Sequence, residues 1–473
     1  MLGSGRLAVG TVARLQQNGR MIQVGAAARE IVTVVGEPLA GYALRSATCT
    51  GSHDPLCARI LVIDDGRRAV VLVVLDLLYV PTTLDAQVRA AVGAAAGVDT
   101  AAVQVSATHT HSGPANLATD PQVQARVVDA AREAAAAARA SAAPAILASA
   151  TRTVTAVGAN RRSPTGFVDD TARIIVARAA DGSHTIATVV SFACHATVLG
   201  HRSTESSADF PGAMCRLLER QVGGTAIYLQ GAAGDVNPVV AMASDPGEAS
   251  PAPDTPPDSA VDRVAARHAE CERIGGMLAA AATGAVLQVA GLQRGLQVTS
   301  PSLQTAFRTT HFDDCRLLAD VELSYRWTDA RAEPAPALPP ADDIDRVRRA
   351  LPGPPGAEDA RLWIRQLRAQ QPNLFGVFDV PTPDRIRLQR IDVGPALSLL
   401  AIPGEPFGTT AAALRARTDR ELVVVGYAHS SIGYLPPPDE WRLGGYEVGC
   451  CPYTDTVEPT IRAAAAALLG DAG

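Results

Sequence analysis

The chain has 473 residues, of which 47% are hydrophobic and 19% charged, and its formal net charge is −6. This composition is typical of a globular protein with a large core, and the acidic balance argues against nucleic acid as a partner. All 42 basic residues are arginine, which excludes a P-loop lysine, a Schiff-base lysine and a Ser-x-x-Lys nucleophile. Eight cysteines without a Cys-x-x-Cys pair favour reduced thiols over a disulfide framework.

The N-terminal segment lacks the apolar stretch of a signal peptide. We therefore expect a cytoplasmic protein with no stable membrane association. Met21 is a second candidate start, so residues 1–20 are predicted to be a disordered extension and residues 21–473 to form the catalytic domain.

A strand–helix–strand unit is the first clear element of the chain. Ala69–Leu75 is a continuous aliphatic run, 84–97 has a helical pattern, and 102–109 returns as a strand. This order predicts a parallel pair of strands with a right-handed crossover. In such sheets, functional sites form beyond the carboxyl ends of the strands.

The remaining pattern alternates helices and strands. We expect helices over 122–140, 209–222, 264–287 and 458–469, and strands over 145–149, 172–177, 185–193, 226–230, 397–402 and 422–427. Proline- and alanine-rich stretches at 244–259 and 334–356 are predicted loops inside one domain, because candidate site residues lie on both sides of them. The fold class is therefore α/β, a single large catalytic domain of mixed β-sheets flanked by helices.

The segment Val103–Pro114 reads VQVSATHTHSGP. In an extended strand, His109 and His111 share one face with the apolar residues before them, and Ser-Gly-Pro then ends the strand. Two imidazoles that converge at a strand end are typical of a zinc site, although the same pattern also suits exposed polar residues.

Four further features carry candidate chemistry. His195 closes the alternating segment IATVVSFACH, and Glu405 follows an apolar strand and a Pro-Gly turn. Tyr434 lies in SSIGYLPPPDEW. The glycine-rich stretch 230–238, QGAAGDVNP, can present backbone N–H groups of 231–234 to a developing oxyanion or can simply form a tight turn.

Together these motifs resemble the neutral/alkaline non-lysosomal ceramidase family. THTHSGP, FACHAT, SADFPG, GAAGDVNP, PGEPF and GYLPPPDEW…GYE occur in that family's order, and the resemblance extends from Met21 to the C-terminus. It implies the N-terminal catalytic domain of that family, with a catalytic Zn²⁺ bound by His109, His111, His195, Glu405 and Tyr434.

The resemblance also implies an arginine and a second tyrosine at the active site. In the segment Asn160–Ser163 we choose Arg161, with Arg162 as the alternative, and Tyr446 is the matching tyrosine. Arg161 and Tyr446 would stabilise the oxyanion of a tetrahedral intermediate, and a histidine or tyrosine near the metal would protonate the leaving amine. Arg161, Tyr446 and His111 are thus the expected catalytic residues.

Other polar residues have weaker assignments. Asp235 and Asp209 are candidates for orienting a ligand, although turn formation or helix capping is the stronger interpretation. His53 is expected near the site by resemblance without being a ligand. The remaining histidines are unassigned: His184, His201, His268, His311 and His429.

Several departures from the family pattern bear on the substrate. Asn237 replaces a frequent serine, and the chain leaves no room for the C-terminal immunoglobulin-like domain of ceramidases. We therefore expect a zinc amidase whose partner is a small soluble N-acyl amide and not ceramide. The oligomeric state is left open.

Alternative functions are a true ceramidase that cleaves N-acylsphingosine, an acyl-transfer enzyme on the same zinc site, and a metal-binding scaffold with a degenerate pocket. A metallo-β-lactamase site is disfavoured because no Asp-His follows the HxH motif, and a serine hydrolase because no Gly-x-Ser-x-Gly occurs.

Overall fold

The computed structural model describes residues 21–42, 45, 47–242, 257–293, 297–300, 305–308, 311–312, 314–335 and 382–470. The predicted extension 1–20 and most of the two predicted loops lie outside these residues.

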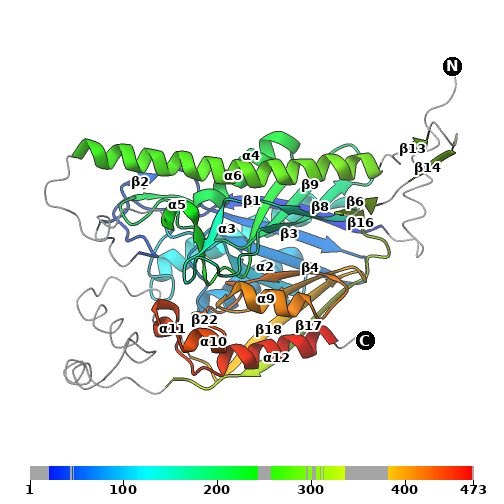
Figure 1. Ribbon diagram of the computed structural model, residues 1–473. Helices are drawn as coiled ribbons and strands as arrows, with labels where there is room; N and C mark the ends of the chain where they lie inside the picture. Colours follow the sequence, from blue (N-terminus) through cyan, green and yellow to red (C-terminus); the bar gives the residue numbers. More distant parts are fainter. Residues whose placement is uncertain are drawn as a thin grey trace, which may run out of the picture.

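Four layers build the molecule, in the order helices, large sheet, small sheet, helices (Figure 1). The ten-stranded sheet has the main order β11-β9-β8-β6-β1-β3-β4-β5, and β16 joins it through β6 and carries β15. The bounds of these strands are β1 Gln23–Glu30, β3 Cys57–Asp64, β4 Ala69–Leu75, β5 Val103–Ala107, β6 Ala143–Thr153, β8 Thr171–Ala179, β9 Thr185–Phe192, β11 Thr225–Gln230, β15 His311–Phe312 and β16 Cys315–Leu317.

A four-stranded sheet lies against the large one, with the order β17 (Leu323–Arg331), β18 (Arg385–Val393), β19 (Leu397–Ala401) and β21 (Glu421–Val425). Aliphatic side chains from both sheets, among them Val70, Val189, Leu399 and Val423, form one buried cluster between them. Removing such side chains from water contributes roughly 1.5–3 kcal/mol each. The inner faces are therefore apolar on both sheets.

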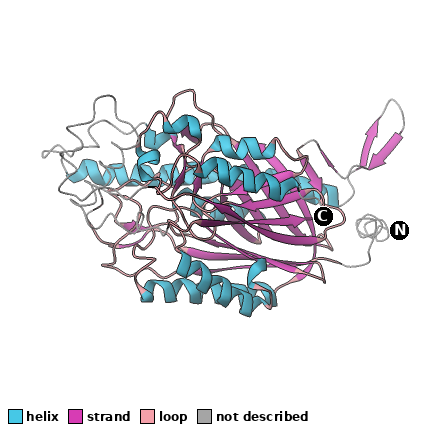
Figure 2. Cartoon of the chain, turned by 90° about the horizontal axis from the view of Figure 1, so that it is seen from below, coloured by secondary structure: helices cyan, strands magenta, loops and turns pink. Residues whose placement is uncertain are grey.

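Helices cover both outer faces, as the view from below also shows (Figure 2). On the large sheet these are α2 (Thr82–Ala96), α3 (Pro121–Ala140), α4 (Asp209–Val222) and α6 (Pro257–Gln293); on the small sheet they are α9 (Gly408–Arg415) and α12 (Val457–Gly470). Short elements complete the described chain: η1 Thr100–Ala102, α5 Val239–Met242, α10 Pro438–Trp441, α11 Tyr446–Cys450, and the strand pairs β2 Gly51–Ser52 with β10 Glu205–Ser206, β7 Gly158–Asn160 with β12 Val236–Pro238, β13 Gln297–Ser300 with β14 Thr305–Arg308, and β20 Glu405–Pro406 with β22 Tyr434–Leu435.

The predicted strand–helix–strand unit is confirmed. β4 and β5 pair in parallel, with Val71 opposite Val103 and Leu75 opposite Ala107, and α2 connects them. The expected start of α3 is also present, because the Asp120 side chain accepts hydrogen bonds from the backbone N–H groups of Gln122 and Val123. The predicted mixed α/β class is therefore the observed one.

One segment of the described chain, Val264–Gln293 in α6, is long and apolar enough to cross a bilayer, judged by length and composition alone. About 44% of its most apolar window is buried inside the protein. Ile274, Leu278 and Val289 pack there against α4 and the large sheet. This pattern is also that of a core helix in a folded domain.

Candidate metal centre

His109 and His111 lie just beyond β5, which ends at Ala107. His109 adopts the left-handed conformation, with φ 64°, so the strand stops before it. The prediction that a continuous strand places both imidazoles on one face is therefore wrong. The turn at His109 brings the two rings together instead, with their Nε2 atoms 3.1 Å apart. Such a conformation costs a non-glycine residue roughly 1–2 kcal/mol, and it is common at functional sites.

His195, which follows β9, completes a three-histidine cluster. Its ring centroid lies 4.7 Å from that of His109, and the ligand atoms of all three rings lie within 4.8 Å of one another. An oxygen of Glu405 is 3.3 Å from Nε2 of His195 and 3.7 Å from Nε2 of His109. His109, His195 and Glu405 are buried, while His111 is partly exposed.

A backbone carbonyl accepts a hydrogen bond from Nδ1 of each of the three rings. A carbonyl oxygen only accepts hydrogen bonds, so each Nδ1 carries the proton and each Nε2 keeps its lone pair. The Nδ1–O distances for His109, His111 and His195 are 2.7, 3.0 and 2.7 Å, and the carbonyls belong to Leu78, Gly41 and Ala233.

The charge state of the cluster follows from its burial. Burial lowers the pKa of His109 and His195 to about 3, and it lowers the pKa of His111 well below its ordinary value. The rings are thus neutral at pH 7, with lone pairs directed at one another across 3.1 Å. A divalent cation between them turns this repulsion into coordination, and imidazole nitrogens with one carboxylate oxygen suit zinc and related ions. The residues present fit a metal ion.

Glu405 and Tyr434 meet through the pairing of two short strands. β20 and β22 run parallel with Glu405 opposite Tyr434. Gly404, at φ 84°, precedes Glu405, and a Cβ atom there would lie 2.4 Å from the carbonyl oxygen of Gly433. Only glycine allows this close approach of the two strands. The Tyr434 ring stacks on His195, with the centroids 6.5 Å apart.

Arg161 is the cation beside the cluster. Its Nη1 lies 3.5 Å from Nε2 of His195, and its guanidinium carbon lies over the Tyr434 ring, 5.4 Å from the centroid. Glu447 accepts from its Nε at 2.7 Å, and Asn237 accepts from Nη1 at 3.0 Å. Asn237 therefore helps to orient this arginine.

Arg162 pairs with Glu440 and Glu447, and no contact with the histidines is found for it within the described residues. Both arginines lower the pKa of Glu447, although burial alone would raise it. The structure thus places Arg161, and not the alternative Arg162, at the cluster. Tyr446 lies farther out: its ring is 5.7 Å from that of Tyr434, and 42% of the residue is exposed.

Two N–H groups of the glycine-rich turn follow the tight-turn alternative. Gly231 donates its N–H to the Phe192 carbonyl and Gly234 donates to the Pro406 carbonyl, so these two groups are not free to bind an oxyanion. The turn instead supplies the Ala233 carbonyl that orients His195. A Cβ atom at Gly234 would lie 2.5 Å from the Glu405 carbonyl oxygen, so the turn also packs against β20.

The two aspartates organise the backbone around the site. Asp235 accepts hydrogen bonds from Asn160 and from the N–H of Gly408, at 2.7 and 3.0 Å. Asp209 accepts from the N–H groups of Leu199 and Phe210, and it does not cap α4 from the N-cap position, which is Ala208. The turn-forming interpretation describes both of them.

Three residues near the cluster escaped the sequence analysis. Tyr427 donates its hydroxyl to Glu405 at 3.2 Å, and its ring lies 4.1 Å from that of His109. Glu447 holds both arginines. Gly41 sits so close to His111 that a Cβ atom there would be 2.5 Å from the ring. In the sequence, Tyr427 and Gly41 are common residue types with no distinctive spacing that would mark them as site residues. Glu447 had one usable signal, because it directly follows Tyr446.

The other histidines lie outside this cluster. His53 stacks on His268 with a centroid distance of 3.6 Å and is not one of the residues of this cluster. His429 is buried against Asp85 and Gln389, at 3.3 and 3.1 Å. The side chain of His311 lies outside the described residues.

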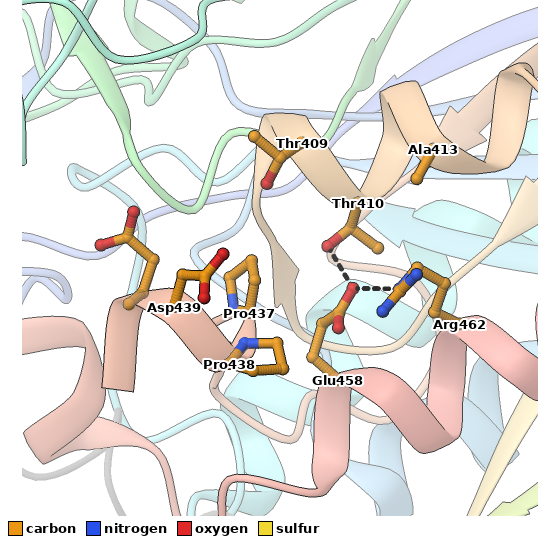
Figure 3. A pocket seen from close by; sticks show the side chains of 9 residues that line it. Thr409, Thr410, Ala413, Pro437, Pro438, Asp439, Glu458 and Arg462 are labelled. Carbon is orange, nitrogen blue, oxygen red and sulfur yellow. Dashed lines mark hydrogen bonds and ion pairs between the residues drawn. The ribbon is translucent and has the colours of Figure 1, made fainter. Parts of the chain in front are cut away.

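A cavity of about 380 Å³ lies between α9, α10 and α12 (Figure 3). Glu458 accepts there from Thr410 at 2.7 Å and from Arg462 at 3.0 Å. Glu440 lines it and connects it to Arg162. None of the predicted site residues lines this cavity.

These observations define a fold and a cluster of the kind that holds one divalent cation. The chain belongs to the family described as "Neutral/alkaline non-lysosomal ceramidase, N-terminal", whose model matches residues 22–290, more than half of its length. It is therefore a member of a neutral ceramidase-like hydrolase family. Glu405, Tyr434 and Tyr446 lie beyond the matched region.

Solved structures agree with this assignment at the level of the fold. Neutral ceramidase from Pseudomonas aeruginosa superposes with a TM-score of 0.66 at 19% identity, covering 95% of this chain and 75% of that one. A structure described as ceramidase complexed with C2 gives a TM-score of 0.68, with the same identity and coverage. No curated protein sequence matches the chain significantly.

Proposed function

We propose that this protein is a zinc-dependent amide hydrolase that cleaves a linear N-acyl amide. The observation that carries the proposal is the convergence of three Nε2 lone pairs on one buried point beside the Glu405 carboxylate. His109, His111, His195, Glu405 and Tyr434 are the proposed ligands. Bound there, zinc would lower the pKa of a water molecule and polarise an amide carbonyl.

The remaining groups bind and stabilise the reacting amide. Arg161 carries a permanent positive charge next to Tyr434 and His195, where it can bind the oxyanion that forms when water adds to the carbonyl. Glu447 fixes the direction of this charge through its 2.7 Å contact. A histidine or tyrosine beside the ion would protonate the leaving amine, and Tyr446 would contact the substrate at the exposed rim.

The substrate we propose is a soluble N-acyl metabolite, cleaved in the cytoplasm without stable membrane association. Asn237 supports a difference from ceramide-cleaving relatives, because its side chain touches Arg161 where that family frequently has serine. Cleavage of N-acylsphingosine and acyl transfer to an amine are the alternatives, since both use the same polarised acyl group.

The test is metal analysis followed by a panel of N-acyl amides that includes short soluble amides and N-acylsphingosine. We expect about one zinc ion at the histidine cluster and faster release of acid from the soluble amides. Release of sphingosine at the higher rate would overturn the substrate proposal alone. A purified protein that binds no divalent metal at the cluster would overturn the hydrolase itself.

A further inference from the structure

A second group of potential ligands shares no residue with the first. His53, Glu205 and His268 each offer one nitrogen or oxygen atom, and these atoms lie within 4.8 Å of one another. We refer to these three residues as the outer cluster. None of them belongs to the site described above.

Two rigid elements bring the outer cluster together. β2 and β10 pair in parallel, with Gly51 opposite Glu205, and the N–H of His53 continues this pairing by donating to the Ser206 carbonyl at 2.9 Å. His268 comes from α6, which Figure 1 draws beside β2. The same helix buries Cys271 and Ile274 in the core. The backbone of each ligand is thus held by ordered structure.

The His268 side chain lacks the hydrogen bonds that a buried imidazole normally makes. The rings of His53 and His268 stack at 3.6 Å, and the Glu205 carboxylate lies 3.8 Å from Nε2 of His268, which is beyond hydrogen-bond distance. Both ring nitrogens of His268 are buried without a hydrogen-bond partner. A buried imidazole has at least one donor and normally satisfies it, so these two nitrogens are open to a ligand.

The chemistry of the ligand set selects the species. Two imidazole nitrogens and one carboxylate oxygen suit zinc, cobalt or nickel, whereas calcium and magnesium prefer all-oxygen sites. Glu205 keeps 43% of its side chain exposed, so an ion can enter and retain water in its open positions.

We propose that His53, Glu205 and His268 form a second binding site for a divalent transition-metal ion. The ion would join the β2–β10 pair to α6. Ser207 directly follows β10. Its backbone carbonyl accepts a hydrogen bond from the Thr110 hydroxyl at 2.6 Å, and its N–H donates to the Ser112 carbonyl at 3.0 Å. Because Thr110 lies between the two histidines of the first cluster, the outer ion would stabilise the segment that presents them.

The experiment is a Zn²⁺ titration of metal-stripped protein, with bound metal counted by mass spectrometry after desalting. We expect about two equivalents in the wild type and about one in His268→Ala and in His53→Ala. His184→Ala, which removes an exposed histidine outside both clusters, is the matched control and should retain two. A His268→Ala protein that binds as much zinc as the wild type would overturn the proposal.

A second variant separates this site from the proposed active site. In a His109→Ala/His195→Ala background we expect one zinc equivalent, which His268→Ala then removes. If the background binds no zinc while its circular dichroism matches the wild type, the outer site does not exist. If that background unfolds, the Co²⁺ absorption of wild type and His268→Ala decides: identical spectra and stoichiometry contradict the outer site. The hydrolase proposal fails separately, through loss of metal at the first cluster.

Discussion

The two histidine clusters differ in how the protein prepares them. In the first, every Nδ1 donates to a backbone carbonyl, so all three lone pairs point inward before any ion arrives. In the outer cluster the rings stack on each other and His268 makes no hydrogen bond. Orientation by a second partner is what raises ligand basicity and fixes geometry at metal sites. The first cluster is therefore preorganised for catalysis, whereas an ion in the outer cluster would join the β2–β10 pair to α6.

The largest expected effect comes from removing a ligand of the first cluster. His195→Ala should lower amide hydrolysis by at least ~10³-fold, about 4 kcal/mol in the activation free energy, because the ion loses a buried ligand. Steady-state rates and bound metal measure this. His268→Ala is the comparison and should keep nearly full activity. Equal losses in both variants would erase the distinction between the clusters.

Substituting Arg161 tests whether catalysis depends on more than the metal ion. Arg161→Met removes the positive charge beside His195 and should reduce kcat/KM by about 10²-fold, roughly 2.7 kcal/mol, at unchanged metal content. Arg162→Met, which alters the neighbouring ion pairs with Glu440 and Glu447, is the matched control and should cost less than 10-fold. A control that loses as much activity as Arg161→Met would assign Arg161 a structural role only.

Asp76 shows what burial does to a titratable group outside both clusters. Burial raises its pKa to about 6, against 3.8 in the unfolded chain, so the folded state holds the proton more tightly between these values. Stability contributed by this residue is present below pH 3.8 and is lost as the pH rises through 6. Asp76→Asn should thus gain about 2–3 kcal/mol over the wild type between pH 4 and pH 7.

Urea unfolding across that pH range measures the difference. Asparagine retains an acceptor for the Cys57 N–H, which lies 2.9 Å from the carboxylate. Asp129→Asn on the exposed face of α3 is the control and should show no such gain. A difference between wild type and Asp76→Asn that does not vary with pH would contradict the assignment.

The smallest expected effect concerns the residue that supports Glu405. Tyr427→Phe removes the hydroxyl that donates to the carboxylate at 3.2 Å and should lower activity by about 5–10-fold, roughly 1 kcal/mol. Tyr453→Phe, a buried phenol that donates to the Pro383 carbonyl, controls for general loss of packing. If both variants keep wild-type rates, the carboxylate needs no such orientation.

The local elements of the fold were predictable because they follow from periodicity. β4 is a continuous aliphatic run, and Asp120-Pro121 is a helix start by capping chemistry alone. The packing of the small sheet on the large one was not predictable, because apolar strands carry no information about which sheet they join. The assignment of His109 to an extended strand failed because its left-handed turn depends on tertiary contacts.

The sequence by itself determined the ligand types, the order of the motifs and the mixed α/β class, since each depends on residue identity and short-range spacing. Only the tertiary structure decided that Glu405 pairs with Tyr434, that Arg161 and not Arg162 faces the histidines, and that His53 stacks on His268. Those contacts join residues that are far apart in the chain. They arise from strand register and helix packing, which depend on the whole core and on no local pattern.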